Sequence, residues 1–438
     1  MMEDNQIYED ILETGSLNGE PVSKIKRKAF TTGIIVGLLV AFLALLAGNF
    51  IARGVRVLML NKNTLSSATS NEVEDDEVVT VDTNRKMMAI EDVIKHYYLK
   101  DVSKEELENG IYSGMVDSLE DPYSAYYSVE ALKEMQQDVE GVYSGIGAYV
   151  ALDVTTTLPM ISGVIEGTPA EEADLRAGDI IYMVDGTTTQ GMDTDEVVKL
   201  IRGEEGTTVH LTLVRESASD YIEVDVERRK VETPTVNYEM MENNIAYIQI
   251  TEFDKVTSDQ FAEALAVCKG SGMEALVLDL RSNPGGSLDV VCDISRKILP
   301  KGLIVYTEDK YGEREEFTCD GQNELTVPMV VLVNGYSASA SEILSGAIKD
   351  YGIGTIMGTT TFGKGIVQRV IGLSDGSALK LTISTYYTPK GNNIHGVGVE
   401  PDVVVEFDAD AYYNEDVDNQ LNAAIDYLNE NYYLETEE

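Results

Sequence analysis

A chain of 438 residues is too long for one ordinary hydrophobic core, so we expect two or three domains with connecting segments. It carries 76 acidic and 33 basic residues, and the resulting net charge of -43 repels phosphate backbones, which argues against nucleic acid as a partner. Three cysteines without C-x-x-C spacing and only three histidines argue against a zinc site and a disulfide framework. We therefore expect no metal.

Residues 29–52 form an uncharged, mostly apolar run that would be about 36 Å long as a helix, enough to span a bilayer. A cleaved signal peptide is the alternative, but the run is longer than the usual apolar region and no clean A-x-A site closes it. Basic residues are denser before the run than after it. The positive-inside rule therefore places residues 1–28 in the cytoplasm as a tail, and residues 53–84 outside the membrane as a polar stalk.

The next two segments differ in their apolar spacing. Residues 85–140 repeat apolar side chains at helical spacing, which predicts several helices. Residues 141–231 alternate in the manner of short strands, with one helix that starts near Asp193. Asp193 and Glu196 have the spacing of a capping box for that helix.

Residues 232–405 alternate short, continuously apolar strands with helices. This order predicts a largely parallel sheet covered on both faces. Residues 406–438 form an acidic segment that we expect to be helical. The predicted architecture is thus an α/β core with an inserted β-rich domain, a helical N-terminal part and one transmembrane helix.

Ser339 is a candidate nucleophile because of its place in the chain. An apolar strand, residues 327–333, leads into the sequence N-G-Y-S-A-S-A-S-E and then into a helical run. A strand-to-helix turn exposes a hydroxyl and directs helix N–H groups at developing negative charge. The alternative is structural, because Ser339 and Glu342 have the spacing of a capping box.

A serine nucleophile needs a base to take its proton. The three histidines are His96, His210 and His395, and none lies in a segment typical of a Ser-His-Asp triad, although His395 remains an alternative. Lys364 lies between two glycines with apolar neighbours. Burial there would disfavour the ammonium form and lower the pKa of the lysine enough for it to act as a base.

These two segments resemble the carboxyl-terminal processing peptidases, also called tail-specific proteases. That family carries an S-A-S-A-S-E segment followed by T-F-G-K-G-x-V-Q, and this chain has both motifs in that order. The resemblance implies that Ser339 is the nucleophile, that Lys364 is the general base and that Gln368 holds the lysine amine. One departure is Tyr336, where many members have glycine, and it leaves the shape of the turn open.

The resemblance extends over residues 86–405. Residues 121–124 resemble the D-P-x-S turn of the family, and residues 280–286 resemble its L-R-x-N-P-G-G loop. The match implies an oxyanion hole made by the N–H of Gly286, or alternatively Gly285, and the N–H of Ala340. A plain turn is the alternative for Pro-Gly-Gly in isolation.

Residues 141–231 look like a PDZ domain. Gly145, Ile146 and Gly147 would form its carboxylate-binding loop, in which backbone N–H groups receive a peptide C-terminus and the peptide adds to a sheet edge. Arg202 follows the predicted helix and is a candidate for coupling this domain to the protease. The alternative is a basic residue favoured by the helix dipole.

The resemblance implies a membrane-anchored extracytoplasmic serine endopeptidase that acts on protein substrates with free C-termini and needs no cofactor. The alternative from another class is a catalytically inactive PDZ scaffold. A two-carboxylate glycosidase has less support, because no acidic pair stands out. The physiological substrate, the effect of the PDZ domain on activity and self-association to a homo-oligomer all stay open.

Overall fold

The computed structural model describes residues 16–17, 20–21, 77–153 and 156–433. The expected transmembrane segment, residues 29–52, lies outside them, as do most of the expected tail and stalk. Within the described ranges, no helix is both long and apolar enough to cross a bilayer. Two short strands near the N-terminus, β1 (Ser16–Leu17) and β2 (Glu20–Pro21), pair with each other antiparallel.

Three N-terminal helices each begin after a serine or threonine whose side-chain oxygen accepts an N–H of the first turn. The helix expected from residue 85 begins earlier, at Val81, because Thr80 provides that cap. The last helix ends at Gly141, whose φ of 65° gives a left-handed C-cap. The three are α3 (Val81–Tyr97), α4 (Lys104–Asp117) and α5 (Val129–Glu140).

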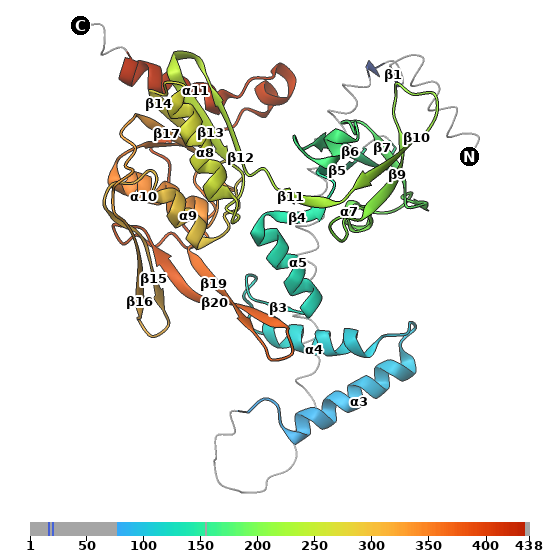
Figure 1. Ribbon diagram of the computed structural model, residues 1–438. Coiled ribbons are helices and arrows are strands. Elements are labelled where there is room, and N and C mark those ends of the chain that lie inside the picture. The colour runs from blue at the N-terminus through green and yellow to red at the C-terminus, as the bar shows by residue number, and fades with distance from the viewer. Residues whose placement is uncertain (1–15, 18–19, 22–76, 154–155, 434–438) are drawn as a thin grey trace, which may run out of the picture.

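The β-rich module follows, shown in green in Figure 1. Strands β4 (Val142–Gly145) and β11 (Arg229–Glu232) pair antiparallel where the chain enters and leaves it. Its main sheet has the order β10-β9-β7-β6-β5, so β5 (Ala148–Leu152) is an edge strand. As expected, α7 (Thr194–Ile201) starts after Asp193 with a capping box. The other elements are β6 (Pro159–Val164), α6 (Pro169–Glu172), β7 (Ile180–Val184), β8 (Thr187–Thr188), β9 (Thr208–Val214) and β10 (Ile222–Glu227).

The α/β core contains a six-stranded sheet of order β12-β13-β14-β17-β18-β21, parallel throughout except for the edge strand β12. Alternate side chains of its central strands face opposite sides, as the continuous apolar runs predict. The strands are β12 (Val236–Met240), β13 (Ile245–Ile250), β14 (Ala275–Asp279), β17 (Met329–Val333), β18 (Thr355–Gly358) and β21 (Val403–Val404).

Helices cover both faces of this sheet. Side chains such as Leu276 and Val331 pack with the helices α8, α9 and α10 on one face, and Val277 and Val330 pack with α11 on the other. The expectation of a doubly covered parallel sheet is therefore confirmed. The helices are α8 (Thr257–Gly270), α9 (Leu288–Ser295), α10 (Ala340–Tyr351) and α11 (Asn419–Leu428).

A second sheet has the order β16-β15-β20-β19, and β3 (Ala125–Tyr127) from the N-terminal part pairs antiparallel with β20. The hydroxyl of Ser124 accepts the backbone N–H of Thr382 at 3.1 Å and fixes the same junction. The N-terminal part is thus joined to the core by pairing between segments that lie far apart in sequence. The remaining strands are β15 (Gly302–Asp309), β16 (Arg314–Cys319), β19 (Ile366–Gly372) and β20 (Ala378–Tyr387).

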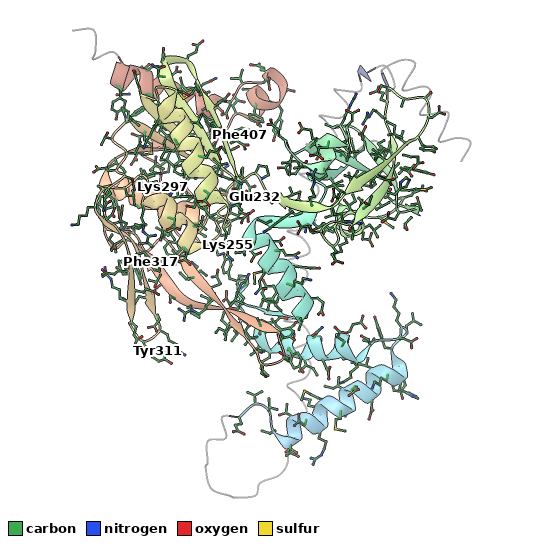
Figure 2. The ribbon with its side chains drawn as sticks, in the orientation of Figure 1. Glu232, Lys255, Lys297, Tyr311, Phe317 and Phe407 are labelled. Carbon is green, nitrogen blue, oxygen red and sulfur yellow. The ribbon has the colours of Figure 1, made fainter. Side chains whose placement is uncertain are left out.

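The C-terminal end of α5 also contacts the core. The backbone N–H of Lys255 donates to the carbonyl of Val139 at 3.1 Å, and the Lys255 ammonium lies 3.6 Å from Glu140. Figure 2 shows Lys255 at this junction, close to Glu232 where the chain returns from the module. All three cysteines are buried as free thiols.

Candidate active site

Ser337 and Ser339 lie in the turn between β17 and α10, and Ser341 lies in the first turn of α10; of the three, Ser339 lines the cavity described below. The hydroxyl of Ser337 donates to the carbonyl of Leu280 at 2.7 Å, and that of Ser341 donates to the carbonyl of Asn283 at 3.0 Å. Both serines are fully buried, whereas Ser339 is partly exposed. The two outer serines therefore hold the turn against the loop of residues 280–286 and leave Ser339 available for chemistry.

The backbone at Ser339 is strained. Its φ of 54° and ψ of -111° lie in a region that residues with a side chain rarely adopt, at a cost of roughly 1–3 kcal/mol. Tyr336, by contrast, has an ordinary negative φ, and its N–H donates to the side chain of Asn334 at 3.0 Å. The turn therefore does not require glycine at position 336, which resolves the departure noted in the sequence.

The two candidate oxyanion donors lie on either side of this turn. Ala340 is the first residue of α10, and Gly286 ends the neighbouring loop. Among the described residues, neither N–H has a protein acceptor, and both residues line the same cavity as Ser339. Such free donors beside a nucleophile are suited to a tetrahedral oxyanion.

The loop approaches the turn so closely that glycine is needed. A Cβ on Gly285 would lie 2.7 Å from the Cβ of Ser339, and one on Gly286 would lie 2.4 Å from the carbonyl oxygen of Phe253. Both glycines also have positive φ, 106° and 142°. Asn283 fixes this geometry, because its side chain accepts the N–H of Gly285 and its carbonyl accepts the N–H of Ala338.

A largely buried cation, whose side chain is 13% exposed, anchors the start of this loop. Arg281 donates to fully buried Asp279 and also to Asp418 and Gln420 at the start of α11. Burial alone would raise the pKa of Asp418, but the hydrogen bond from Arg281 holds that pKa below its usual value. The C-terminal helix is thereby tied to the strand that leads into the candidate oxyanion loop.

Lys364 lies on a loop packed tightly against residues 395–398. A Cβ on Gly363 or Gly365 would lie within 3.1 Å of backbone atoms of that segment, so close approach requires glycine on both sides of the lysine. Burial lowers the pKa of Lys364, nearby Lys380 lowers it further, and the charges of Glu342 and Asp121 act in the opposite direction. Phe362, expected to contribute to the burial, instead points to solvent and is 55% exposed.

Ser339, Lys364, Gln368, Gly286 and Ala340 all line one cavity of about 430 Å³, here called the Ser339 cavity. The structure therefore brings these five residues, from segments far apart in sequence, to one place.

The expected contact of Gln368 with the lysine amine is not present in this arrangement. The Lys364 amine lies 4.7 Å from the centre of the Tyr123 ring, and the Gln368 amide donates to the hydroxyl of Thr382 at 3.3 Å. Across the described residues, no hydrogen bond joins the Lys364 amine to Ser339 or Gln368. The aromatic ring takes the place expected of these partners because a cation is attracted to its face.

The carboxylate of Glu342 connects the nucleophile turn to the lysine loop. One oxygen accepts the N–H groups of Ser339 and Lys364, each at 2.8 Å. The other accepts the hydroxyl of Thr361 at 2.6 Å and the N–H of Gly363 at 2.7 Å. Glu342 is fully buried, so these four donors provide the stabilisation that solvent cannot. The expected capping partner of Ser339 thus also sets the position of the lysine.

No histidine lines the Ser339 cavity. His395 is exposed, and its backbone packs against Gly365 rather than toward Ser339. His210 is on the surface of the β-rich module between Glu223 and Asp225. Among the described residues there is also no cluster of three side chains that could hold a metal ion.

Known protein families match three parts of the chain. Peptidase family S41 matches residues 244–405, the PDZ domain matches residues 160–215, and the N-terminal domain of the activating protease CtpB matches residues 45–131. The carboxy-terminal processing protease CtpA of Bacillus subtilis is 37% identical over 319 residues, which cover 73% of this chain and 68% of CtpA. The chain belongs to the carboxy-terminal processing serine proteases of family S41.

Other members of the processing-protease family are also similar. A probable CtpA-like serine protease of Staphylococcus haemolyticus is 33% identical over 87% of this chain and 74% of its own length. The solved structure of a photosystem II D1 C-terminal processing protease is 30% identical, with a TM-score of 0.44 over 73% of this chain and 86% of that one. The matches to peptidase family S41, to the PDZ domain and to CtpA confirm the family and the PDZ domain that were expected from the motifs.

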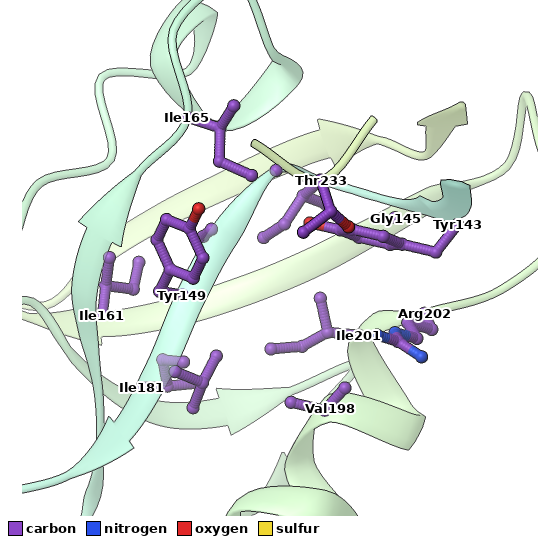
Figure 3. A pocket seen from close by; sticks show the side chains of 14 residues that line it. Tyr143, Gly145, Tyr149, Ile161, Ile165, Ile181, Val198, Ile201, Arg202 and Thr233 are labelled. Atoms are coloured by element: carbon purple, nitrogen blue, oxygen red, sulfur yellow. The ribbon is translucent and has the colours of Figure 1, made fainter. Parts of the chain in front are cut away.

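The PDZ domain of this processing protease has a groove of about 240 Å³ beside the edge strand β5, shown in Figure 3. Gly145, Ile146 and Gly147 line one end of it, and Ile201 and Arg202 at the end of α7 line another part. Gly147 has a φ of 84°, and a Cβ there would lie 2.3 Å from the Cβ of Thr168. The loop therefore requires glycine at this position.

Arg202, the candidate coupling residue, lies with its guanidinium 4.7 Å from the centre of the Tyr143 ring (Figure 3). It also lines a larger cavity of about 930 Å³ between the PDZ domain and α5, together with Lys133 and Asp138. This places Arg202 at the boundary between the PDZ domain and the N-terminal helices, and not in the Ser339 cavity.

Sequence reasoning missed two groups of residues in this protease. Tyr123 belongs to a recognised turn motif, but nothing in the sequence indicates its contact with Lys364, which depends on the pairing of β3 with β20. Lys380 and Asp254 also line the Ser339 cavity. Lys380 lies in β20, whose alternation could have marked it as facing one side of the sheet, but not which side. Asp254 lies in the loop between β13 and α8, where no periodic pattern applies.

Proposed function

We propose that this processing protease is a membrane-anchored, extracytoplasmic endopeptidase that hydrolyses peptide bonds with a Ser339–Lys364 dyad and recognises protein C-termini through its PDZ domain. The observation that carries the catalytic part is the convergence of strained Ser339, half-buried Lys364 and two free N–H groups on one cavity.

The first half of the reaction follows from these groups. The neutral amine of Lys364 takes the proton of the Ser339 hydroxyl while the oxygen attacks the substrate carbonyl carbon. The carbonyl oxygen becomes an oxyanion that accepts the N–H groups of Gly286 and Ala340, each worth about 3 kcal/mol of barrier. The lysine then gives its proton to the departing amine as the peptide bond breaks, which leaves an acyl-enzyme.

The second half repeats the proton transfers with water. Lys364 takes a proton from a water molecule that attacks the acyl carbon, and Ser339 regains that proton when its ester bond breaks. The lysine amine must leave the Tyr123 ring to reach Ser339. Its flexible side chain permits this, and catalytic hydrogen bonds often tighten only when substrate is bound.

The geometry of the PDZ groove supports recognition of a peptide C-terminus. Strand β5 is at the edge of its sheet, so an extended peptide can pair with it. Backbone N–H groups of the loop 145–147 are suited to a terminal carboxylate. The groove is lined by aliphatic side chains, which favours an apolar terminal residue; they are Ile146, Val150, Ile161, Ile165, Ile181, Val198 and Ile201.

Membrane anchoring is supported by the sequence of residues 29–52 and by the basic residues before them. An anchored protease of this orientation would meet proteins outside the cytoplasm. Its acidic surface, with a net charge of -43, would keep the catalytic part away from anionic lipid headgroups.

The experiment that tests this function compares the full-length chain with its Ser339→Ala variant on an unfolded protein. We expect new peptides with the wild type and none with the variant, detected by mass spectrometry. Equal product from both proteins would overturn the catalytic assignment. Peptide binding without cleavage by either protein would instead favour the inactive PDZ scaffold.

A further inference from the structure

The Ser339 cavity is electrically asymmetric. Lys364 and Lys380 line one part of it, whereas Asp138, Glu252 and Asp254 line another. Both lysines have a role in the proposed proton transfer, since Lys364 is the base and Lys380 lowers the pKa of Lys364. The three carboxylates have no part in that chemistry, although they line the same space as the nucleophile.

Asp254 is the most unusual of the three because the residue is largely buried while its carboxylate, at the cavity, has no protein partner among the described residues. The residue is only 6% exposed, and in the described part of the chain its carboxylate has no hydrogen bond and no ion pair. Its backbone already forms the turn before α8, since its N–H donates to the Thr257 hydroxyl and its carbonyl accepts the Thr257 N–H. The side chain is therefore not used as a helix cap, and it borders the cavity.

The surroundings of Asp254 are electronegative. The C-terminal end of α5, which carries the negative end of the helix dipole, packs against it, since a Cβ on the C-cap Gly141 would lie 2.9 Å from the Asp254 Cβ. Burial, then Glu252 and Asp138, raise the pKa of the Asp254 carboxyl to about 7. The nearby Lys255 ammonium is directed to Glu140 instead, at 3.6 Å.

A buried carboxylate without a counter-ion is costly, and a cation that enters the cavity would relieve that cost. The described carboxylates do not have the arrangement of a metal site. One organic cation is the occupant that matches the charge of these carboxylates and their place in the same cavity as the nucleophile.

We propose that Asp254, assisted by Glu252 and Asp138, binds the ammonium or guanidinium group of a lysine or arginine side chain near the scissile bond of the substrate. This inference rests on the proposed function of Ser339 and adds a charge preference to it. Exposed Glu252 and Asp138 attract the cation toward the cavity, and Asp254 receives it inside.

The test uses the full-length chain and a set of fluorogenic peptides. One lysine is moved through each position of an otherwise neutral sequence, and every peptide has a twin with norleucine, a neutral residue of similar shape. We expect lysine at one position to raise kcat/KM roughly tenfold or more over its twin, as a charge-assisted hydrogen bond would. Asp254→Asn should reduce that ratio toward one.

Two comparisons make the result specific. Asp259→Asn removes the same charge from an exposed position on α8 outside the cavity, so it should leave the lysine-to-norleucine ratio unchanged. In the wild type, the ratio should rise from pH 6 to pH 8 as Asp254 ionises. Ionisation of Lys364 affects both twins equally and cancels from the ratio. The pH dependence of the wild-type ratio therefore tests the cation site even if Asp254→Asn does not fold.

The outcomes distinguish failure of the proposed cation site from failure of the proposed Ser339 protease function. Cleavage of the neutral peptides with no lysine preference at any position, or with a preference that Asp254→Asn and pH leave intact, would overturn the cation site alone. If no peptide were cleaved more by the wild type than by Ser339→Ala, the proposed function would fail and the cation site with it.

Discussion

The backbone N–H of Lys364 donates a hydrogen bond of 2.8 Å to the carboxylate of Glu342. The same oxygen accepts the N–H of Ser339 at 2.8 Å. A single buried charge thus fixes the separation between the backbones of the two residues that we propose as nucleophile and base. A displacement of either residue would slow the reaction, because the rate of proton transfer depends steeply on geometry.

Glu342→Gln should therefore lower both activity and stability. Glutamine has one acceptor oxygen where the carboxylate accepts four donors, and its amide hydrogens would face some of them. We expect a loss of about 2–3 kcal/mol in the free energy of unfolding and a fall in kcat of at least roughly tenfold, with KM little changed. Denaturant titration and steady-state kinetics measure the two effects. Glu324→Gln, at an exposed position, is the control, and an unchanged kcat in Glu342→Gln would contradict the positioning role.

Replacement of Ser339 separates strain from chemistry. Alanine and glycine both remove the nucleophilic oxygen, so neither variant should cleave protein. Only glycine tolerates a φ of 54° with a ψ of -111°, so Ser339→Gly should be more stable than Ser339→Ala by about 1 kcal/mol. Thermal or denaturant unfolding of the two inactive proteins measures the difference. Equal stabilities would mean that this turn stores no strain.

The pH dependence should reveal a lysine base. Because Lys364 must be neutral to accept a proton, kcat/KM should rise with pH through an ionisation below the ordinary lysine value of about 10.4. Lys380 lowers the pKa of Lys364, so Lys380→Met should move this rise to higher pH. Glu342 raises that pKa, so any activity left in Glu342→Gln should rise at lower pH. Shifts in the same direction would exclude this electrostatic account.

Lys364→Arg provides a stricter test of the same base. Guanidinium keeps its proton at every accessible pH, so this variant should be inactive throughout the profile. A variant without its three histidines should keep the wild-type profile if it folds. Loss of activity in the folded histidine-free protein, with activity retained in Lys364→Arg, would indicate a triad instead.

Recognition of C-termini should depend on Gly147. An alanine there would collide with Thr168, whose Cβ lies 2.3 Å from the added carbon, and would distort the loop beside the groove. We expect at least a roughly tenfold loss of affinity for a peptide with a free, apolar C-terminus, measured by fluorescence anisotropy. Gly191→Ala is a matched control, because Gly191 has a similar φ of 86° but open space around it. Amidation of the peptide should weaken binding to the wild type, and an amidated peptide that binds equally well would argue against capture of the carboxylate.

The residues that we propose as catalytic were accessible to sequence reasoning, because each lies in a continuous motif whose glycines and serines have local structural roles. Contacts between segments that are far apart in sequence could not be predicted in this way. Glu342 has the spacing of a cap, but three of its four donors come from residues 361–364. Phe362 looked like a burying neighbour because it is apolar, yet the side of the loop it occupies is decided by Gly363 and Gly365 packing on residues 395–398.

The position of Tyr123 is a clearer example of a contact between distant segments that the sequence does not predict. Its ring meets the Lys364 amine only because β3 adds to β20, a pairing between Ala125–Tyr127 and residues 378–380. Short strands with few residues carry little periodic signal, and their partners cannot be chosen from spacing. The expected contact of Gln368 with the lysine amine is absent from this arrangement. Nothing in the sequence indicated that an aromatic ring would contact the amine instead.

Arg281 contacts Asp418 and Gln420, which are synthesised after every residue that lines the Ser339 cavity. Ser339, Lys364 and the loop of residues 280–286 all leave the ribosome before the start of α11. Until Asp418 and Gln420 follow, Arg281 has only Asp279 to bind at the entrance of that loop. A chain truncated before residue 418 would keep Ser339 and Lys364, which we propose as nucleophile and base, yet lack this anchor.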